Sequence, residues 1–95
     1  MVNVHNAQGK KIITIVDSQL IGKHFEQGRR QLDMASNFYK GEEMPESKIK
    51  QIVPSAYIVH IVGKESIAFA QREHIIGKGM KMITIAGIPH AEIVF

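Results

Sequence analysis

One stretch of the chain, residues 21–42, concentrates the side chains that could hold a ligand. Glycines at positions 22, 28 and 41 allow backbone conformations with positive φ there. The cations and aromatic rings interleaved with Gly22, Gly28 and Gly41 are Lys23, His24, Arg29, Arg30 and Lys40, with Phe25, Phe38 and Tyr39. This mixture suits an anionic or planar partner, because cations contact phosphates and rings stack on bases. No spacing in it matches a P-loop, a zinc finger or a nucleophile motif, so the residues predict a binding stretch and assign no catalytic residue.

The histidines are the other side chains that could do chemistry. His24, His60 and His90 could act as acid–base groups or metal ligands, but the chain has no HxxxH, HxH or HExxH spacing. His60 lies inside an apolar run, where we expect a ring held by backbone groups. The chain has no cysteine, which excludes disulfides, thiolate zinc sites and iron–sulfur clusters. We therefore predict no metal and no cofactor.

Composition limits the classes of protein to which the chain can belong. Its 95 residues are 44% hydrophobic, enough for one domain, residues 1–95, with one modest core. A formal charge of +3 is compatible with nucleic acid, although no motif for reading a DNA sequence is present. No signal-peptide pattern and no apolar run of spanning length occurs, so we expect a cytoplasmic protein without a membrane segment. The sequence leaves the oligomeric state open.

The elements that must position these residues begin with a hairpin. Alternation over residues 2–5 and β-branched residues over 11–16 predict two strands, with Gly9 in the turn. Asp17 and Ser18 offer side-chain oxygens to free amides, which predicts a short helix over residues 19–25. Alternating charges over residues 29–35 predict a third strand, with an ionic outer face.

The second half of the chain predicts helices between strands. Pro45 and Glu46 favour a helix start and Pro54 ends that helix. The apolar run 55–62 favours a buried strand, although periodicity alone does not exclude a buried helix. Residues 64–75 form a helical pattern, and residues 80–86 and 88–95 form two strand patterns. Pro89 would cost a ladder bond inside a strand, so we expect it at an edge, a bulge or a strand start.

This order of elements predicts an α+β fold in a single small domain. We expect a mixed or mainly antiparallel sheet with two or three helices packed mostly on one face. The segments that are most continuously apolar should supply the core, which we expect to include Ile58, Ile61 or Val62, Ile67, Ala70, Ile83 and Ile85.

Four phrases, taken in order, resemble an archaeal family known as domain of unknown function 424. They are Leu20-Ile21-Gly22-Lys23 with Phe25 and Gly28, then Phe38-Tyr39 with Gly41, then Ile61-Val62-Gly63-Lys64-Glu65-Ser66, and then Gly87-Ile88-Pro89-His90-Ala91. The resemblance spans nearly the whole chain and implies an archaeal, intracellular, single-domain α+β protein without an established activity. His60 stands where we would expect an asparagine, which puts an amide-dependent role at that position in question. The motif positions carried forward, without a role, are Gly22, Lys23, Phe25, Gly28, Phe38, Tyr39, Gly41, Gly63, Pro89 and His90.

Two classes of function follow from these residues. The favoured one is a binding module for RNA or a ribonucleoprotein, associated with translation, in which the cations contact phosphates and Phe38 or Tyr39 stacks a base. The alternative is an enzyme that uses His90, His60 or His24 as acid–base or metal groups, and a protein-interaction scaffold is a third hypothesis. The binding residues expected are Gly22, Lys23, Phe25, Gly28, Arg29, Arg30, Phe38, Tyr39, Gly41, Pro89 and His90.

Overall fold

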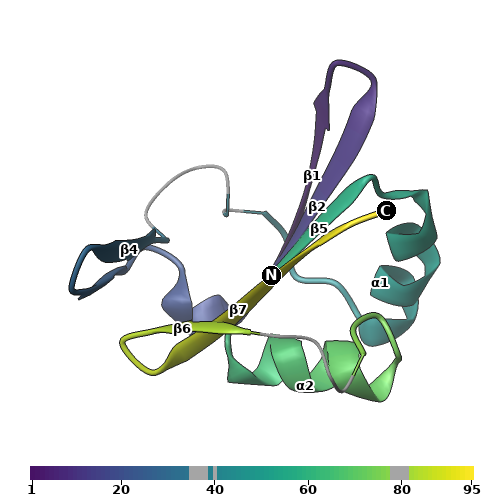
Figure 1. Cartoon of the computed structure of the whole chain (residues 1–95). Coiled ribbons are helices and arrows are strands. Elements are labelled where there is room, and N and C mark those ends of the chain that lie inside the picture. The colour runs from purple at the N-terminus through teal and green to yellow at the C-terminus, as the bar shows by residue number, and fades with distance from the viewer. Residues whose placement is uncertain (35–38, 40, 78–81) are drawn as a thin grey trace.

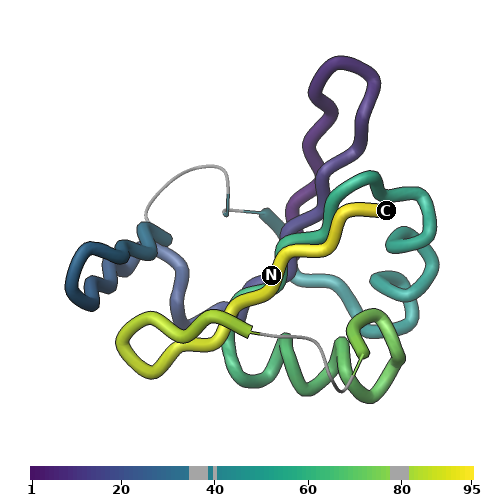
Figure 2. The backbone as a smooth tube through the Cα atoms, viewed as in Figure 1, coloured from purple at the N-terminus to yellow at the C-terminus, as the bar shows by residue number. Residues whose placement is uncertain are grey.

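Segments rich in β-branched residues from both halves of the chain build one mixed sheet. A computed structural model of the whole chain describes residues 1–34, 39, 41–77 and 82–95. The strands of this sheet are β1 (Val2–Ala7), β2 (Lys10–Val16), β5 (Ile58–Val62), β6 (Ile83–Ile85) and β7 (Ile88–Val94). Their order is β1-β2-β5-β7-β6, with β2 and β5 parallel and the other neighbours antiparallel (Figures 1 and 2). The predicted α+β domain with a mixed sheet is confirmed, and the run 55–62 contains a strand.

A second, two-stranded sheet follows β2 in the chain. Strands β3 (His24–Gln27) and β4 (Arg30–Asp33) pair antiparallel, with Gly28 in the turn between them. Residues 30–33 of the predicted third strand are confirmed. The helix predicted over residues 19–25 is wrong, because only a single 3-10 turn, η1 (Ser18–Leu20), forms before the chain extends into β3. Asp17 makes no side-chain bond to that turn, so the cap on which the prediction rested is absent.

Two α-helices lie between the strands. Helix α1 (Glu46–Ile52) has Pro45 at its N-cap position and continues into a 3-10 turn, η2 (Val53–Ser55). Helix α2 (Lys64–Arg72) connects β5 to the C-terminal hairpin β6–β7 and is shorter than predicted. The predicted start at residues 45–46 is confirmed. Pro54 lies in the 3-10 turn, where its missing amide hydrogen ends the α-helical bonding.

Two hydrophobic clusters stabilise this arrangement. The first joins residues of α1 and α2 to the sheet and includes Ile49, Ile61, Ile67, Phe69 and Ala70. The second joins η1 and the β3–β4 hairpin to the sheet through Val16, Leu20, Leu32, Met34, Val62 and Ile85. In Figure 1 the β3–β4 hairpin lies on the opposite side of the sheet from α1.

Burial corrects one predicted core residue. Ile61, Val62, Ile67, Ala70 and Ile85 are buried as expected, and Ile58 is half-buried. Ile83 is 42% exposed, so its assignment to the core is wrong. It lies on the edge strand β6, which among the described strands pairs with β7 alone. An apolar segment on an edge strand keeps part of its surface in solvent, which hydrophobicity alone does not reveal.

Candidate functional site

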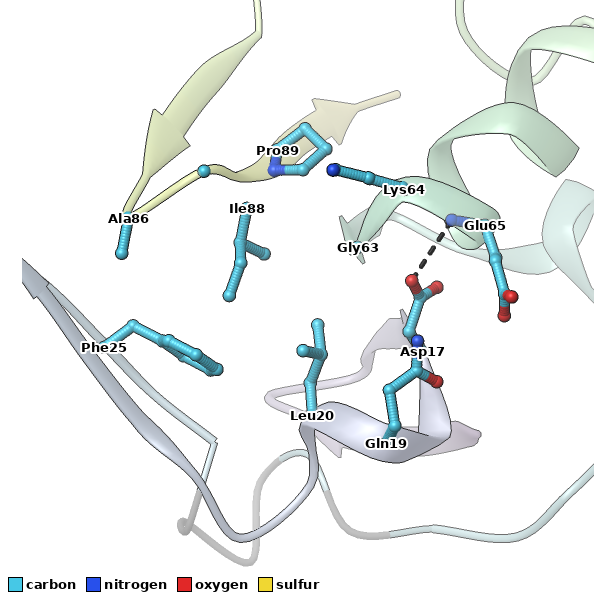
Figure 3. A pocket seen from close by; sticks show the side chains of 11 residues that line it. Asp17, Gln19, Leu20, Phe25, Gly63, Lys64, Glu65, Ala86, Ile88 and Pro89 are labelled. Atoms are coloured by element: carbon cyan, nitrogen blue, oxygen red, sulfur yellow. Dashed lines mark hydrogen bonds between the residues drawn. The ribbon is translucent and has the colours of Figure 1, made fainter.

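Three of the four phrases quoted above meet at one pocket. The pocket has a volume of about 520 Å³ and lies where β2 and β5 end, α2 begins and the β6–β7 hairpin turns (Figure 3). Its lining residues are Asp17, Gln19, Leu20, Phe25, Gly63, Lys64, Glu65, Ala86, Gly87, Ile88 and Pro89. The carboxyl ends of neighbouring parallel strands face the same edge of a sheet, where α/β proteins commonly bind ligands. Position in the fold and size therefore make this pocket a candidate ligand site.

Asp17 builds one corner of the pocket and is buried, with 5% of its surface exposed. Its carboxylate accepts a hydrogen bond from the amide of Glu65 at 3.1 Å and from the amide of Ser66 at 2.7 Å. The Ser66 hydroxyl donates a third bond to Asp17 Oδ1 at 2.6 Å. Asp17 therefore caps α2 from a distant part of the chain, and its carboxylate serves structure rather than a ligand.

Gly63 makes that cap possible. Its φ is 107°, in the region that residues with side chains rarely adopt. A Cβ built on Gly63 would overlap the carboxylate of Asp17. Glycine is therefore needed for two reasons, the backbone angle and the close approach of the carboxylate.

The walls of the pocket are apolar and its rim is polar. Leu20 is buried, and Phe25, Ile88 and Pro89 are half-buried, so parts of the aromatic ring and of the facing turn remain accessible. In Figure 3 the Phe25 ring and the Ile88 side chain lie on facing sides of the open space. Gln19, Lys64 and Glu65 are exposed, and Lys64 makes no ion pair within the described ranges. Such a pocket can accept a flat apolar group together with one anionic group near Lys64.

The cations of the β3–β4 hairpin lie next to this pocket. Lys23, Arg29 and Arg30 are exposed, and none of their side chains forms an ion pair with another described residue. The hairpin is joined to the turn between β6 and β7 by a 2.8 Å hydrogen bond from the Ala86 amide to Gln27 Oε1. The hairpin and the residue before it thus carry Lys23, Arg29 and Arg30 beside a turn that lines the pocket, and Phe25 lines the pocket itself.

The three glycines of the opening stretch have backbone roles. Gly22 donates its amide hydrogen to the Met34 carbonyl at 2.8 Å, and Gly28 lies in the hairpin turn. A Cβ on Gly41 would overlap the backbone carbonyl of Val2. The positive φ of Gly22 (85°) and of Gly28 (61°), together with the close approach at Gly41, explain these glycines without a ligand. The predicted binding residue Phe38 lies outside the described residues.

A second group of polar and aromatic side chains lies on the sheet face that carries the second hydrophobic cluster. The rings of Tyr39 and His60 pack edge to face with centroids 5.7 Å apart, and so do the rings of His60 and His90. His60 lies in β5, between two neighbouring strands. Its register partner in β2 is Thr14, and its register partner in β7 is Glu92. Thr14 Oγ1 and His90 Nε2 are buried and have no hydrogen-bond partner among the described residues. We refer to Tyr39, His60 and His90 as the ring cluster.

The surroundings of the ring cluster keep its members uncharged at neutral pH. Burial lowers the pKa of His60, the neighbouring His90 lowers it further, and Glu92 opposes both effects. Burial also lowers the pKa of His90, together with the positive charge of Arg30. The pKa of the Tyr39 phenol is raised by burial and by the carboxylates of Glu92 and Asp33. Neutral imidazoles can exchange protons but do not neutralise phosphates.

The structure thus divides the expected site residues between two places. Phe25 and Pro89 line the pocket, with Lys23, Arg29 and Arg30 on the adjoining hairpin, whereas Tyr39 and His90 belong to the ring cluster. Sequence reasoning missed the roles of Asp17, Gln19 and Lys64 in the pocket and of Thr14 and Glu92 beside the ring cluster. For Glu92 a signal was present, because residues two apart in a strand share a face and Glu92 is two residues after His90 in the predicted strand. For the others no local pattern points to the partner.

Two further properties of the described part of the chain bear on function. No group of three or more His, Asp or Glu side chains within it could hold a metal ion. None of its helices has the length and apolar character needed to cross a membrane.

A comparison with family models identifies the family of this chain. Residues 5–95 of the chain match the sequence model of the family "Protein of unknown function (DUF424)". Among solved structures it is similar to an uncharacterized conserved protein from Methanopyrus kandleri, with a TM-score of 0.79, 18% identity, and coverage of 98% of this chain and 88% of that one. No curated protein matches the chain significantly. The match over nearly the whole sequence means that the chain belongs to the DUF424 family.

Proposed function

We infer that this protein is a binding module for RNA or a ribonucleoprotein, and that the β3–β4 hairpin provides its phosphate contacts. The observation that carries the inference is the set of exposed cations Lys23, Arg29 and Arg30 without an ion-pair partner among the described residues. A cation that no carboxylate neutralises can contact a phosphate and release a counterion, which drives nucleic-acid binding. The net charge of +3 acts in the same direction.

The carboxylates of the hairpin, Glu26 and Asp33, lie on the opposite face of the two strands from Arg30. Directly paired residues share a face, so the pair Gln27 and Arg30 lies on the same face as Phe25 and its partner Leu32. Glu26 and Asp33 occupy the other face, where both contact His24, Glu26 at 2.9 Å and Asp33 at 4.0 Å. We therefore assign phosphate contacts to the hairpin tip and to the face of Arg30, and not to the outer face.

The experiment is a salt series of RNA binding with two matched double variants. Arg29→Ala with Arg30→Ala removes two charges from the hairpin, and Lys48→Ala with Lys50→Ala removes two from α1. Fluorescence anisotropy with a labelled single-stranded RNA should show weaker binding for the hairpin variant. Its log–log salt slope should be flatter by roughly 0.7 for each lost phosphate contact, while the α1 variant keeps the original slope.

Two results would refute this assignment. Equal losses for both double variants would mean that only the overall charge matters, and absence of binding at about 50 mM salt, where electrostatic association is strong, would remove RNA as the partner. A protein-interaction surface would then be the better interpretation of the hairpin. Because Arg29 and Arg30 are exposed and form no ion pair with a described residue, the hairpin variant should change the free energy of unfolding by no more than about 0.5 kcal/mol. The α1 variant also loses the ion pair of the exposed Lys50 with Glu73, so its loss should stay under about 1 kcal/mol.

A second candidate is acid–base catalysis by the ring cluster. It is supported by the contact between His60 and His90, which lie far apart in the sequence, and by their lowered pKa values. If the pair acts on bound RNA, end-labelled RNA should shorten during incubation with the protein, and His90→Gln should abolish the cleavage. RNA that stays intact with the unmodified protein rules out this activity and leaves the binding proposal as it stands.

A further inference from the structure

We propose that the pocket at the ends of β2 and β5 holds one unpaired nucleotide of the RNA, with its base beside Phe25 and its phosphate at Lys64. This assignment rests on the proposed RNA-binding function and deepens it, because it requires a base that is free of duplex pairing. The first argument is size. A volume of about 520 Å³ lies within the range of roughly 300 to 1,000 Å³ that is usual for small-molecule sites, so a nucleoside monophosphate fits.

The second argument is the chemistry of the walls. Part of the Phe25 ring is accessible, and Ile88 and Pro89 lie across the space as apolar partners (Figure 3). A base between them would be stacked on one side and covered by aliphatic groups on the other, which is favourable for any base. Gln19 at the rim carries one amide donor and one acceptor for the edge of that base.

The third argument is the distribution of charge. Asp17 is the most buried acid of the lining. Its carboxylate already accepts three hydrogen bonds, two from backbone amides and one from a hydroxyl. The same bonds use amides at the start of α2, so the helix end is not the anion site. Lys64 is exposed and has no carboxylate partner in the described residues, and it is left as the cation that can contact a phosphate.

The fourth argument is continuity with the proposed phosphate-binding surface. Phe25 belongs to β3, directly after Lys23, and shares a hairpin face with Arg30. Leu32 of this face packs on the second cluster, but Arg30 is exposed and part of the Phe25 ring is accessible. A single strand that passes the edge of the hairpin could therefore contact Arg30 with one phosphate and place a base against Phe25. Duplex RNA keeps its bases stacked inside the helix, so it could use the cations but not the pocket.

The test uses 5′-AMP as the probe, with adenosine and inorganic phosphate as its two halves, and follows backbone amides by NMR. AMP should shift the amide signals of Gly63, Lys64 and Gly87, adenosine should shift them with weaker affinity, and phosphate alone should leave them unchanged. Lys64→Met should weaken AMP binding by about tenfold and adenosine binding hardly at all. Phe25→Leu, which keeps an apolar side chain on the second cluster, should weaken both by about tenfold. Lys48→Met is the matched control and should change neither.

The outcomes separate this proposal from the RNA-binding proposal. If AMP leaves these amides unchanged while RNA still binds through Arg29 and Arg30, the pocket assignment is overturned and RNA binding stands. If AMP binds as described but no RNA binds, the pocket is a site for a free nucleotide, so its assignment to RNA is overturned together with the RNA proposal. If single-stranded and duplex RNA displace AMP equally well, the requirement for an unpaired base is wrong.

Discussion

Replacing Asp17 with alanine should destabilise the fold more than its position in a surface turn suggests. The carboxylate lies after β2 but caps α2, where it accepts bonds from the amides of Glu65 and Ser66 and from the Ser66 hydroxyl. Alanine would leave these donors without partners, and Ser66 is only 8% exposed, so water could replace the carboxylate poorly. The change also removes the link between the start of α2 and the end of β2.

The size of the effect follows from these contacts. Loss of an N-terminal cap costs about 0.5 to 2 kcal/mol, and a buried donor left without a partner costs about 1 to 3 kcal/mol. We expect a total loss of about 3 kcal/mol for Asp17→Ala. At about 4 to 8 °C per kcal/mol for a domain of this size, the melting temperature should fall by about 12 to 24 °C.

Urea unfolding followed by far-ultraviolet circular dichroism measures this loss. Asp17→Asn keeps the shape and one acceptor oxygen, so it should cost about half as much. Ser18→Ala is the matched control and should cost less than about 1 kcal/mol, because the exposed Ser18 hydroxyl donates to exposed Glu43 and, among the described residues, to no other. A loss under about 0.5 kcal/mol for Asp17→Ala would refute the capping role.

A double-mutant cycle with Gly63→Ala tests the same geometry independently. In the original protein the new Cβ meets the Asp17 carboxylate and adds the strain of a positive φ, so we expect a cost of about 2 to 5 kcal/mol. In the Asp17→Ala background the overlap disappears and only backbone strain of about 1 to 3 kcal/mol remains. Costs that simply add would contradict the close contact.

The remaining expectations concern the core, pH and metal content. Ile61 is fully buried, so Ile61→Ala should lower the free energy of unfolding by about 2 to 5 kcal/mol in urea unfolding. Ile83 is 42% exposed, so Ile83→Ala should lower it by under about 1 kcal/mol. Similar losses for the two variants would contradict this difference in burial. The folded-state pKa values of His60 and His90 are lowered, so the unfolded chain binds more protons, and stability should be constant above about pH 6.5 and fall as the pH drops below it. His60→Gln should reduce this loss of stability at low pH. If the variant shows the same dependence of stability on pH as the original protein, burial of His60 does not resist its protonation. Elemental analysis of untagged protein should find no stoichiometric zinc or iron, since neither the histidine spacing nor the described residues offer a ligand set.

The sequence alone determined most of the local structure. Alternating and β-branched residues predicted the strands, because these patterns act on neighbouring residues through backbone sterics and burial. Pro45 with Glu46 and the Gly9 turn predicted element ends for the same local reason. The cations of the hairpin and Phe25 were also predicted as binding candidates from sequence, although the segment of Phe25, strand β3, was mistaken for a helix.

Only the tertiary structure decided which distant residues meet. From the sequence, Asp17 was predicted to cap the segment that follows it. Its carboxylate instead accepts hydrogen bonds from the amides of Glu65 and Ser66, which lie 48 and 49 residues away. Ile83 looked like a core residue until its strand proved to be an edge of the sheet. A local pattern determines the conformation of a segment and the face that each side chain takes. The order of strands in the sheet depends on packing among all segments at once, and that order brings His60 against His90 and builds the pocket beside Phe25.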